Sequence, residues 1–474
     1  MSREADAKQL GSQDIERAIS RVIAETFSIA IDQINPELSY QSISQWDSMA
    51  HINLMLALEK NFQIKIDQDK VLDLITIRDI FAFIIKNQTL DEPTEHALNK
   101  LNKKNIPIFR GLNNVYFDES RVAFIDTENG KLFYRGYSIN DLVEYATYEE
   151  VAYLLIYGGL PNKKNLAVFK EKIESMRGLS AEMIAIIRVL ANKQTATNVL
   201  RTLVSALSET VNELSLEDQG IAYIAKIPTI IGVFFAFKNN RSLPVPPKGL
   251  SQAEYLLFML LGRIPDSSIV RIFEQNMILQ AEHDSNASTF SARITTSTES
   301  EVGNAITSAI ATFSGWLHGG ALLGVMEMLE EIQDINNVKT YIQNRLSKKL
   351  PVFGFGHRVY RIEDPRAEPL KVNAKILVEK QGNDKLLKIL EAVKEEMSPY
   401  IDHGININVD FYACISYLLM EIQKDMLVPI FIANRSSGWV AHILEQKKNN
   451  ILIRPRLHYV GEKNKKFISI DERI

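Results

Sequence analysis

The chain has 474 residues, 46% of them hydrophobic, and its 54 Lys and Arg against 58 Asp and Glu give a formal net charge of −4. This length predicts about two to four compact units, and the small net charge excludes a bulk electrostatic attraction to nucleic acid. The single cysteine, Cys414, excludes an internal disulfide and argues against a cysteine-based metal site.

The N-terminal residues do not resemble a targeting segment. They read MSREADAKQL and contain no apolar h-region. We also expect no later stretch to approach the roughly 20 apolar residues that a membrane-spanning helix needs. The sequence therefore predicts a protein without a membrane segment, located in the cytoplasm.

Residues 10–87 predict a small helical bundle. Apolar residues recur with a 3.6-residue period from Ile15 to Phe27, from Ile52 to Phe62 and from Ile77 to Ile85. Up to residue 90 the chain has nine Lys and Arg against thirteen Asp and Glu, so this piece carries the whole net charge of −4. Residues 88–105 are polar, contain Pro93 and predict a linker.

Ser48 stands directly before the second helical stretch, after Asp47. Taken alone, a serine here indicates a helix N-cap in a purely structural bundle. With the loop FSIAIDQINPELSYQSISQW before it and Leu-Glu-x-x-Phe after it, the segment resembles acyl carrier proteins of the phosphopantetheine-binding family. That resemblance implies 4'-phosphopantetheine on Ser48, attached by a phosphopantetheinyl transferase that docks on the acidic face. A phosphodiester also suits a helix N-terminus, where free N–H groups and the positive end of the dipole meet it.

The sequence from residue 106 onward predicts a mostly helical unit. FRGLNNVYFDESRVAFIDTENGKLFYRGYS alternates apolar and polar residues around turn signals and predicts short strands. After it come long apolar or amphipathic stretches such as NVLRTLVSALSETV and YACISYLLMEIQ, separated by Gly or Pro loops. The predicted class is all-α, with a short β segment at the start of this unit.

Three histidines, His283, His318 and His357, lie in Asn- or Gly-rich turns beside predicted helices. Together with Asp410 they could in principle bind a metal, but no two of them form a local pair such as His-x-x-x-His, so we expect none. Asp410 lies in the apolar text NINVDFYACISYLL, where burial raises the pKa of a carboxyl group. From context alone it is either a helix N-cap or a general base near neutrality.

Three arginines, Arg366, Arg435 and Arg454, stand beside Pro, Ala or Asn turns. Any one of them could be an ordinary surface residue. Taken together they suit a substrate with several carboxylates, because a guanidinium group binds a carboxylate with two parallel hydrogen bonds.

From Phe109 to Gly461 the chain resembles citrate synthases in the order and spacing of its motifs. The motifs include FIDTENGKLFYRGYSINDL, AEHDSNASTFSARI, GWLHGG, FGFGHRVYRIEDPRA, NVDFY, ANRSSGW and RPRLHYVG. The resemblance implies that residues 106–474 form a large helical domain with an inserted small domain at roughly 325–430. It further implies a homodimer or a larger assembly.

The same resemblance implies roles for the polar residues. His318, His357 and Asp410 would be catalytic, and His283, Arg366, Arg435 and Arg454 would bind the 2-oxo acid, with Arg454 coming from the neighbouring subunit. CoA would be held by Val352, Phe353, Gly354, Phe355, Gly356 and Arg361.

The implied reaction is condensation of an acyl thioester, acetyl-CoA or a related one, with oxaloacetate or a similar 2-oxo acid. Leu322 replaces the asparagine that usually follows His-Gly-Gly-Ala. The sequence therefore does not specify which acyl group is the substrate. The predicted product is citrate or an alkylcitrate, with the fused carrier delivering the acyl donor. The alternatives are an ordinary citrate or 2-methylcitrate synthase that uses free acyl-CoA, and a non-catalytic scaffold.

Overall fold

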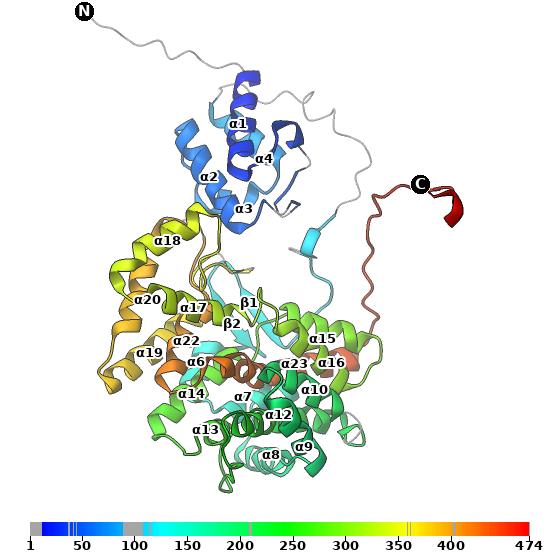
Figure 1. Cartoon of the computed structure of the whole chain (residues 1–474), viewed down its shortest axis with the longest axis vertical. Helices are drawn as coiled ribbons and strands as arrows, with labels where there is room; N and C mark the ends of the chain where they lie inside the picture. The colour runs from blue at the N-terminus through cyan, green and yellow to red at the C-terminus, as the bar shows by residue number, and fades with distance from the viewer. Residues whose placement is uncertain are drawn as a thin grey trace, which may run out of the picture.

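The computed structural model describes residues 12–88, 108–112, 115–207 and 211–473, with gaps at 37, 41, 44, 358, 361 and 402–403. Within these residues the protein is mostly helical, as predicted, with one small sheet. Figure 1 shows a helical bundle at the N-terminal end, a larger helical body below it and a C-terminal tail that leaves the body.

The N-terminal bundle is built from α1 (Ser12–Phe27), α2 (Ser48–Phe62), α3 (Gln68–Asp73) and α4 (Ile77–Gln88). The three predicted apolar stretches fall on α1, α2 and α4, and their apolar residues form one buried core around Trp46. Asp47 caps α2, because its carboxylate accepts the N–H of Ala50 at 2.8 Å. Ser48 begins α2, but its side chain lies outside the described residues.

The predicted short strands form a three-stranded antiparallel sheet in the order β1-β2-β3. The strands are β1 (Ala123–Asp126), β2 (Lys131–Tyr134) and β3 (Tyr137–Ser138), and Ala123 lies opposite Tyr134. Tyr134 is fully buried, and its hydroxyl donates to the carbonyl of Glu282 at 2.8 Å. The sheet therefore contacts the turn that carries His283.

The helical body follows in chain order. Its helices are α6 (Ile139–Tyr145), α7 (Tyr148–Tyr157), α8 (Lys163–Met176), α9 (Ala181–Ala191), α10 (Ala196–Ala206), α12 (Leu216–Lys238), α13 (Gln252–Leu261), α14 (Ser267–Gln280), α15 (Ala287–Ser297), α16 (Val302–Phe313) and α23 (Leu427–Lys448). A group of helices between α16 and α23 packs together as a side lobe: α17 (Ala321–Ile332), α18 (Val338–Ser347), α19 (Ala367–Gln381), α20 (Lys385–Glu396), α21 (Ser398–Ile401) and α22 (Val409–Leu419). One continuous hydrophobic core runs through the body and this lobe.

Helices α12 and α23 cross at the centre of the body and are buried along most of their length. At the crossing, a Cβ added to Gly220 would lie 2.3 Å from Cγ1 of Val440, so only glycine permits this approach. The expectation that no stretch reaches membrane-spanning length is wrong for α12, whose 23 residues pass by length and composition. The apolar window of α12 is 89% buried inside the protein, as in a core helix.

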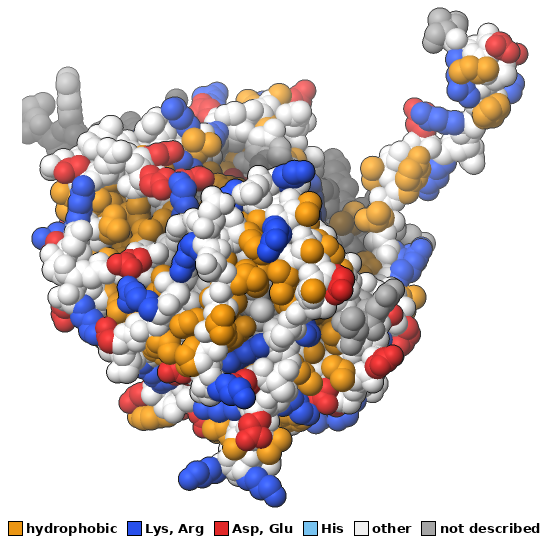
Figure 2. All heavy atoms as spheres, turned by 60° about the horizontal axis from the view of Figure 1, so that its bottom comes forward, with side chains coloured by type: hydrophobic (Ala, Val, Ile, Leu, Met, Phe, Trp, Pro, Cys, Tyr) orange, Lys and Arg blue, Asp and Glu red, His pale blue; other side chains and the backbone are white. Residues whose placement is uncertain are grey.

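Figure 2 shows the face at the lower end of Figure 1, where apolar side chains are interspersed with both kinds of charge. The C-terminal tail projects from the body in the same view and carries apolar and basic side chains. Leu457, Val460 and Phe467 in this tail are 99%, 88% and 82% exposed. The tail therefore has almost no contact with the rest of its own chain.

Candidate active site

A large cavity of about 3000 Å³ lies between the body, the side lobe and the sheet. Six of the seven catalytic and substrate-binding residues that the sequence singled out line it: His283, His318, His357, Arg366, Asp410 and Arg435. The structure therefore brings together residues that are up to 152 positions apart in the chain.

His283 lies in the turn between α14 and α15 and is only 6% exposed. Its ring lies 5.0 Å from that of His357, and its Nε2 has no hydrogen-bond partner among the described residues. Burial and the nearby Arg366 guanidinium hold the pKa of His283 well below its usual value. A neutral ring with an unsatisfied buried nitrogen is suited to hydrogen-bonding a ligand.

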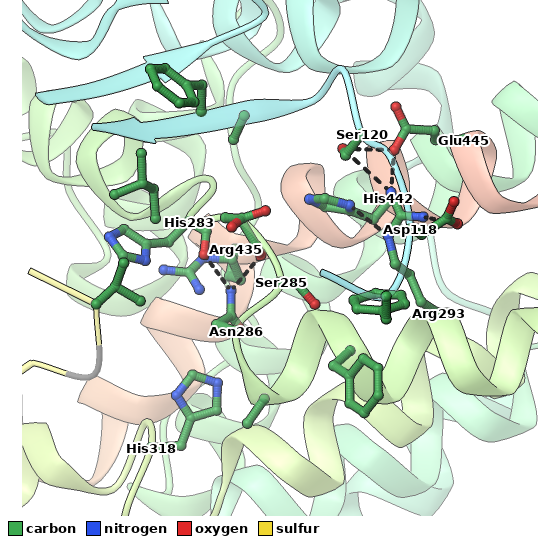
Figure 3. A pocket seen from close by; sticks show the side chains of 18 of the residues that line it. Asp118, Ser120, His283, Ser285, Asn286, Arg293, His318, Arg435, His442 and Glu445 are labelled. Atoms are coloured by element: carbon green, nitrogen blue, oxygen red, sulfur yellow. Dashed lines mark hydrogen bonds and ion pairs between the residues drawn. The ribbon is translucent and has the colours of Figure 1, made fainter. Parts of the chain in front are cut away.

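A buried chain of polar groups holds the His283 turn in place. Glu282 Oε1 lies 2.9 Å from Nε2 of His442, and Nδ1 of His442 accepts from Nε of Arg293 at 3.0 Å. Arg293 also pairs with Glu445 at the edge of the cavity. Figure 3 shows Arg293, His442 and Glu445 of this network to the right of His283 and Arg435, with His318 below them. No sequence motif predicted the network, because its members lie on α15, α23 and the turn.

His318 lies in the glycine-rich turn between α16 and α17, with its ring 4.7 Å from that of Phe313. Burial lowers the pKa of His318 to about 3, so the ring is neutral. Its Nε2 lies 2.9 Å from the hydroxyl of Ser288 and 3.4 Å from the Ser288 backbone N–H. Because an amide N–H can only donate, Nε2 accepts and the ring proton lies on Nδ1.

The tautomer of His357 is fixed in the opposite sense. Its Nδ1 accepts from the backbone N–H groups of Val359 and Tyr360, both at 3.0 Å. The ring proton of neutral His357 therefore lies on Nε2. Two neutral histidines in one cavity thus present N–H donors, which can stabilise negative charge that develops on an oxygen atom.

The two buried arginines have different partners. Arg366, at the start of α19, donates from Nε and Nη2 to the two oxygens of Asp364 at 2.9 and 2.7 Å. Arg435 on α23 donates from Nε to the Gln280 carbonyl at 2.6 Å and has no paired carboxylate among the described residues within ion-pair distance. Burial lowers the pKa of Arg435 to about 10.

Asp364 was not singled out by the sequence. Burial raises its pKa, but the charge and hydrogen bonds of Arg366 outweigh this effect and leave the pKa below its usual value. With Asp364 ionised, the two guanidinium groups leave one net positive charge, which favours an anionic ligand. The Asp-Pro-Arg sequence at 364–366 was the available signal.

Asp410 lies in the first turn of α22 and is 8% exposed. Its backbone N–H donates to Oδ1 of Asn408, which caps the helix in its place. Burial raises the pKa of Asp410 to about 7, although Arg366 opposes the shift. Of the two interpretations of Asp410, the helix N-cap is therefore wrong, and a carboxyl group poised to exchange a proton near neutrality fits.

The predicted CoA residues do not all reach the cavity. Gly356 lines it, whereas Val352 is buried in the core and Phe353 packs edge-to-face against Trp316. Gly354 has φ +83°, and a Cβ there would lie 2.5 Å from the Phe411 ring, so this turn needs glycine.

Three further sequence candidates, Phe355, Leu322 and Arg454, do not line the cavity of this chain. Phe355 packs against the N-terminal bundle. Arg361 lies outside the described residues, and Leu322 is fully buried rather than exposed to the cavity. Arg454 lies in the exposed C-terminal tail and does not line the cavity of its own chain.

Donor atoms of His283, His357 and Asp364 lie within 4.8 Å of one another, close enough to share a metal ion. Both oxygens of Asp364 already accept from Arg366, and Nδ1 of His357 accepts backbone N–H groups. Arg435 adds a further positive charge nearby. These contacts oppose binding of a cation and suit an anion.

Comparison with known proteins relates the body of the chain to one family. Residues 111–456 match the family model "Citrate synthase, C-terminal domain". The citrate synthase of Haloferax volcanii is 39% identical over 77% of this chain and 98% of its own length. The 2-methylcitrate synthase 2 of Corynebacterium glutamicum is 37% identical over 77% of this chain and 97% of its own length.

Solved structures give the same relation. The citrate synthase of Thermotoga maritima superposes with a TM-score of 0.72 at 34% identity, covering 77% of this chain and 99% of that one. The Thermoplasma acidophilum citrate synthase, solved with carboxymethyl coenzyme A and oxaloacetate, has a TM-score of 0.74 at 30% identity and is covered completely, against 77% of this chain. The family match begins after the N-terminal bundle.

The buried pair of Asp364 and Arg366 generates a stability prediction. Replacement of Asp364 by Asn leaves the Arg366 charge buried without its counter-ion, and we expect the free energy of unfolding to fall by about 3 kcal/mol. The matched control is Asp384→Asn, which breaks an exposed pair with Lys388 at 2.9 Å and should cost less than about 1 kcal/mol. Denaturant unfolding followed by circular dichroism measures both, and equal costs would contradict the assignment.

Proposed function

Because the chain belongs to the citrate synthase family, we propose that it condenses an acyl-CoA with oxaloacetate to form citrate or 2-methylcitrate. One observation carries the proposal: the buried carboxyl group of Asp410, with a pKa of about 7, shares a cavity with the N–H donors of His318 and His357 and with the buried arginines Arg366 and Arg435. This set suits removal of a carbon-bound proton next to a thioester, followed by attack on a 2-oxo acid.

In the first step, the carboxylate of Asp410 takes a proton from the carbon next to the thioester carbonyl. The Nδ1–H of His318 donates to the thioester oxygen and stabilises the enolate. This donor is available because Ser288 occupies Nε2 of His318. The enolate carbon is then formed next to the second substrate, which converts a bimolecular reaction into a local one.

In the second step, the enolate carbon attacks the 2-oxo carbonyl carbon of oxaloacetate. The Nε2–H of His357 donates a hydrogen bond that polarises that carbonyl and stabilises the alkoxide that forms, and the proton that Asp410 removed from the acyl carbon balances the protonation of this alkoxide. Arg366, Arg435 and His283 bind the carboxylates of oxaloacetate, as their charges and the unsatisfied Nε2 of His283 permit. Water then hydrolyses the condensed thioester and releases CoA.

The first assay identifies the acyl donor. We expect purified protein with oxaloacetate to release free thiol from acetyl-CoA or propionyl-CoA, detected with a thiol reagent. Asp410→Asn keeps the shape of the side chain but removes the base, so kcat should fall by about 10²- to 10⁴-fold. Wild-type turnover in this variant, or no thiol release from any short acyl-CoA, would exclude the proposed reaction.

The same assay has a defined pH dependence. Asp410 must be ionised to act as a base, and its pKa is raised to about 7. Activity should therefore rise about tenfold per pH unit below pH 7 and level off above it. A profile that is flat between pH 5 and 7 would contradict the role of Asp410.

We also propose that the active site is completed by a second copy of the chain. Arg454 is exposed in a tail that leaves its own body (Figure 1), and the apolar side chains of Leu452, Leu457 and Val460 near it are exposed as well. A tail of this kind suits contact with a neighbouring subunit in a symmetric dimer. The arginine would then add a third guanidinium to the partner's cavity.

Mixed dimers test this arrangement. Arg454→Ala and Asp410→Asn should each be nearly inactive alone. When equal amounts are dissociated and reassociated, half of the dimers are mixed and each contains one intact site, so about a quarter of wild-type activity should return. No recovery, although mass spectrometry shows mixed dimers, would show that Arg454 does not act across subunits.

We further propose that the N-terminal bundle is an acyl carrier, with 4'-phosphopantetheine on Ser48. Two observations support it: the capped N-terminus of α2 starts at this residue, and Asp73 of the bundle lines the same cavity as Asp410. A carrier that is part of the chain would raise the local concentration of its acyl group near the site. The condensation itself does not require it, since free acyl-CoA supplies the same thioester.

Intact mass after incubation with CoA and a phosphopantetheinyl transferase tests the carrier. We expect one phosphopantetheine increment on the wild type and none on Ser48→Ala. The control is Ser28→Ala at the exposed end of α1, which should still be modified. An unmodified wild type would leave an ordinary synthase with a structural bundle.

A further inference from the structure

The N-terminal bundle is packed against the side lobe that carries half of the active site. Ile405 of the lobe is 6% exposed and belongs to the buried core of the bundle. Phe355 and Tyr400, also of the lobe, pack against the same core. The two units thus share apolar surface, which excludes water from this part of the lobe.

Polar contacts extend the same interface. The hydroxyl of Tyr400 lies 3.5 Å from Oδ1 of Asn53 on α2. Lys349, just after α18, donates to the carbonyl of Thr26 at 2.6 Å and to the hydroxyl of Ser28 at 3.0 Å. Figure 1 shows the bundle seated at the α18 end of the lobe. The lobe therefore meets the bundle through α1, α2 and the shared core.

The lobe residues at this interface belong to two backbone segments that are bridged to each other. Phe355 pairs with Ile407 in an antiparallel bridge. The N–H of Gly356 donates to the carbonyl of Asn406 at 2.8 Å, and the N–H of Asn408 donates to the carbonyl of Gly354 at 3.0 Å. The two hydrogen bonds that form this bridge thus fix one segment relative to the other.

Each of these segments leads directly into the active site. His357 follows Gly356, and Asp410 lies two residues after Asn408. The side chain of Asn408 connects them, because its Nδ2 donates to the carbonyl of Gly356 at 3.1 Å and its Oδ1 accepts the N–H of Asp410 at 3.0 Å. A shift of the bridge therefore moves both catalytic side chains.

We infer that the N-terminal bundle is a built-in positioning element of the active site. By packing on Phe355, Tyr400 and Ile405, it holds the bridged segments that place His357 and Asp410 opposite each other. The family match starts at residue 111, so this support is added by a part of the chain outside the match. The kinetic part of the inference rests on the proposed condensation, whereas its structural part does not.

The expected size of the effect follows from the sensitivity of catalysis to geometry. A displacement of about 1 Å by a change far from the chemistry can cost about 10²-fold in rate. Partial loosening of the bridge should therefore lower kcat by about tenfold. Binding of acyl-CoA elsewhere in the cavity should change little, so KM for acyl-CoA should stay within about twofold.

The test uses the full-length protein with Asn53→Arg, which places a long cation against Tyr400 without changing the body of the enzyme. The matched control is Asn61→Arg, the same substitution at an exposed position of the same helix. Asn53→Gln is the conservative variant and should keep wild-type kcat. Ile405→Ser weakens the same interface from the lobe side and leaves the bundle sequence intact.

Hydrogen exchange measured by mass spectrometry supplies a readout that does not depend on activity. We expect Asn53→Arg and Ile405→Ser to speed exchange about tenfold in peptides that contain the Phe355–Ile407 bridge, and to lower kcat. Asn61→Arg should change neither. Wild-type exchange and kcat in both interface variants would overturn the inference. If even the wild type lacks condensation activity, the proposed function fails while the exchange result still decides whether the bundle holds the bridge.

Discussion

Burial of charge in one cavity is the constraint on which the site depends. Arg366, Arg435 and Asp410 are all at least nine-tenths buried. Burial of each of these charged groups destabilises the protein unless a partner compensates it. Only Arg366 has a full counter-ion, Asp364, so Arg435 retains unneutralised charge and Asp410 has a pKa shifted to about 7. The buried charge of Arg435 can therefore be compensated by a substrate carboxylate, and Asp410 can exchange a proton near neutral pH.

The surrounding helices make that imbalance possible. The core helices α12 and α23 pack closely at Gly220, and α23 carries Arg435, which lines the cavity. The sheet holds the His283 turn through Tyr134, while the lobe brings Asp410 and His357 from the other side. No single element contains the site, so its geometry depends on how the body and the lobe pack.

Sequence patterns predicted the helical class, the strands before α6 and the histidines, aspartate and arginines that meet in the cavity. They succeeded because motif order specifies residue identity and because apolar periodicity specifies helices. They could not reveal Asp364 as the partner of Arg366, or Ser288 as the residue that fixes the His318 tautomer, because both roles arise from tertiary contacts. The apolar run of α12 was underestimated for a similar reason, since Lys226 and Pro228 inside it do not interrupt a core helix.

The N-terminal bundle covers apolar side chains of the lobe that lie close to the active site. In a lobe without a covering unit, Ile405 would face solvent and Phe355 would lose part of its packing, which would weaken the bridge between their segments. Here their packing against the core of the bundle links the stability of the bundle to the placement of two catalytic side chains. A ligand or modification that binds the docked and undocked bundle differently would therefore change turnover by its difference in affinity, and one without such a difference would have no effect.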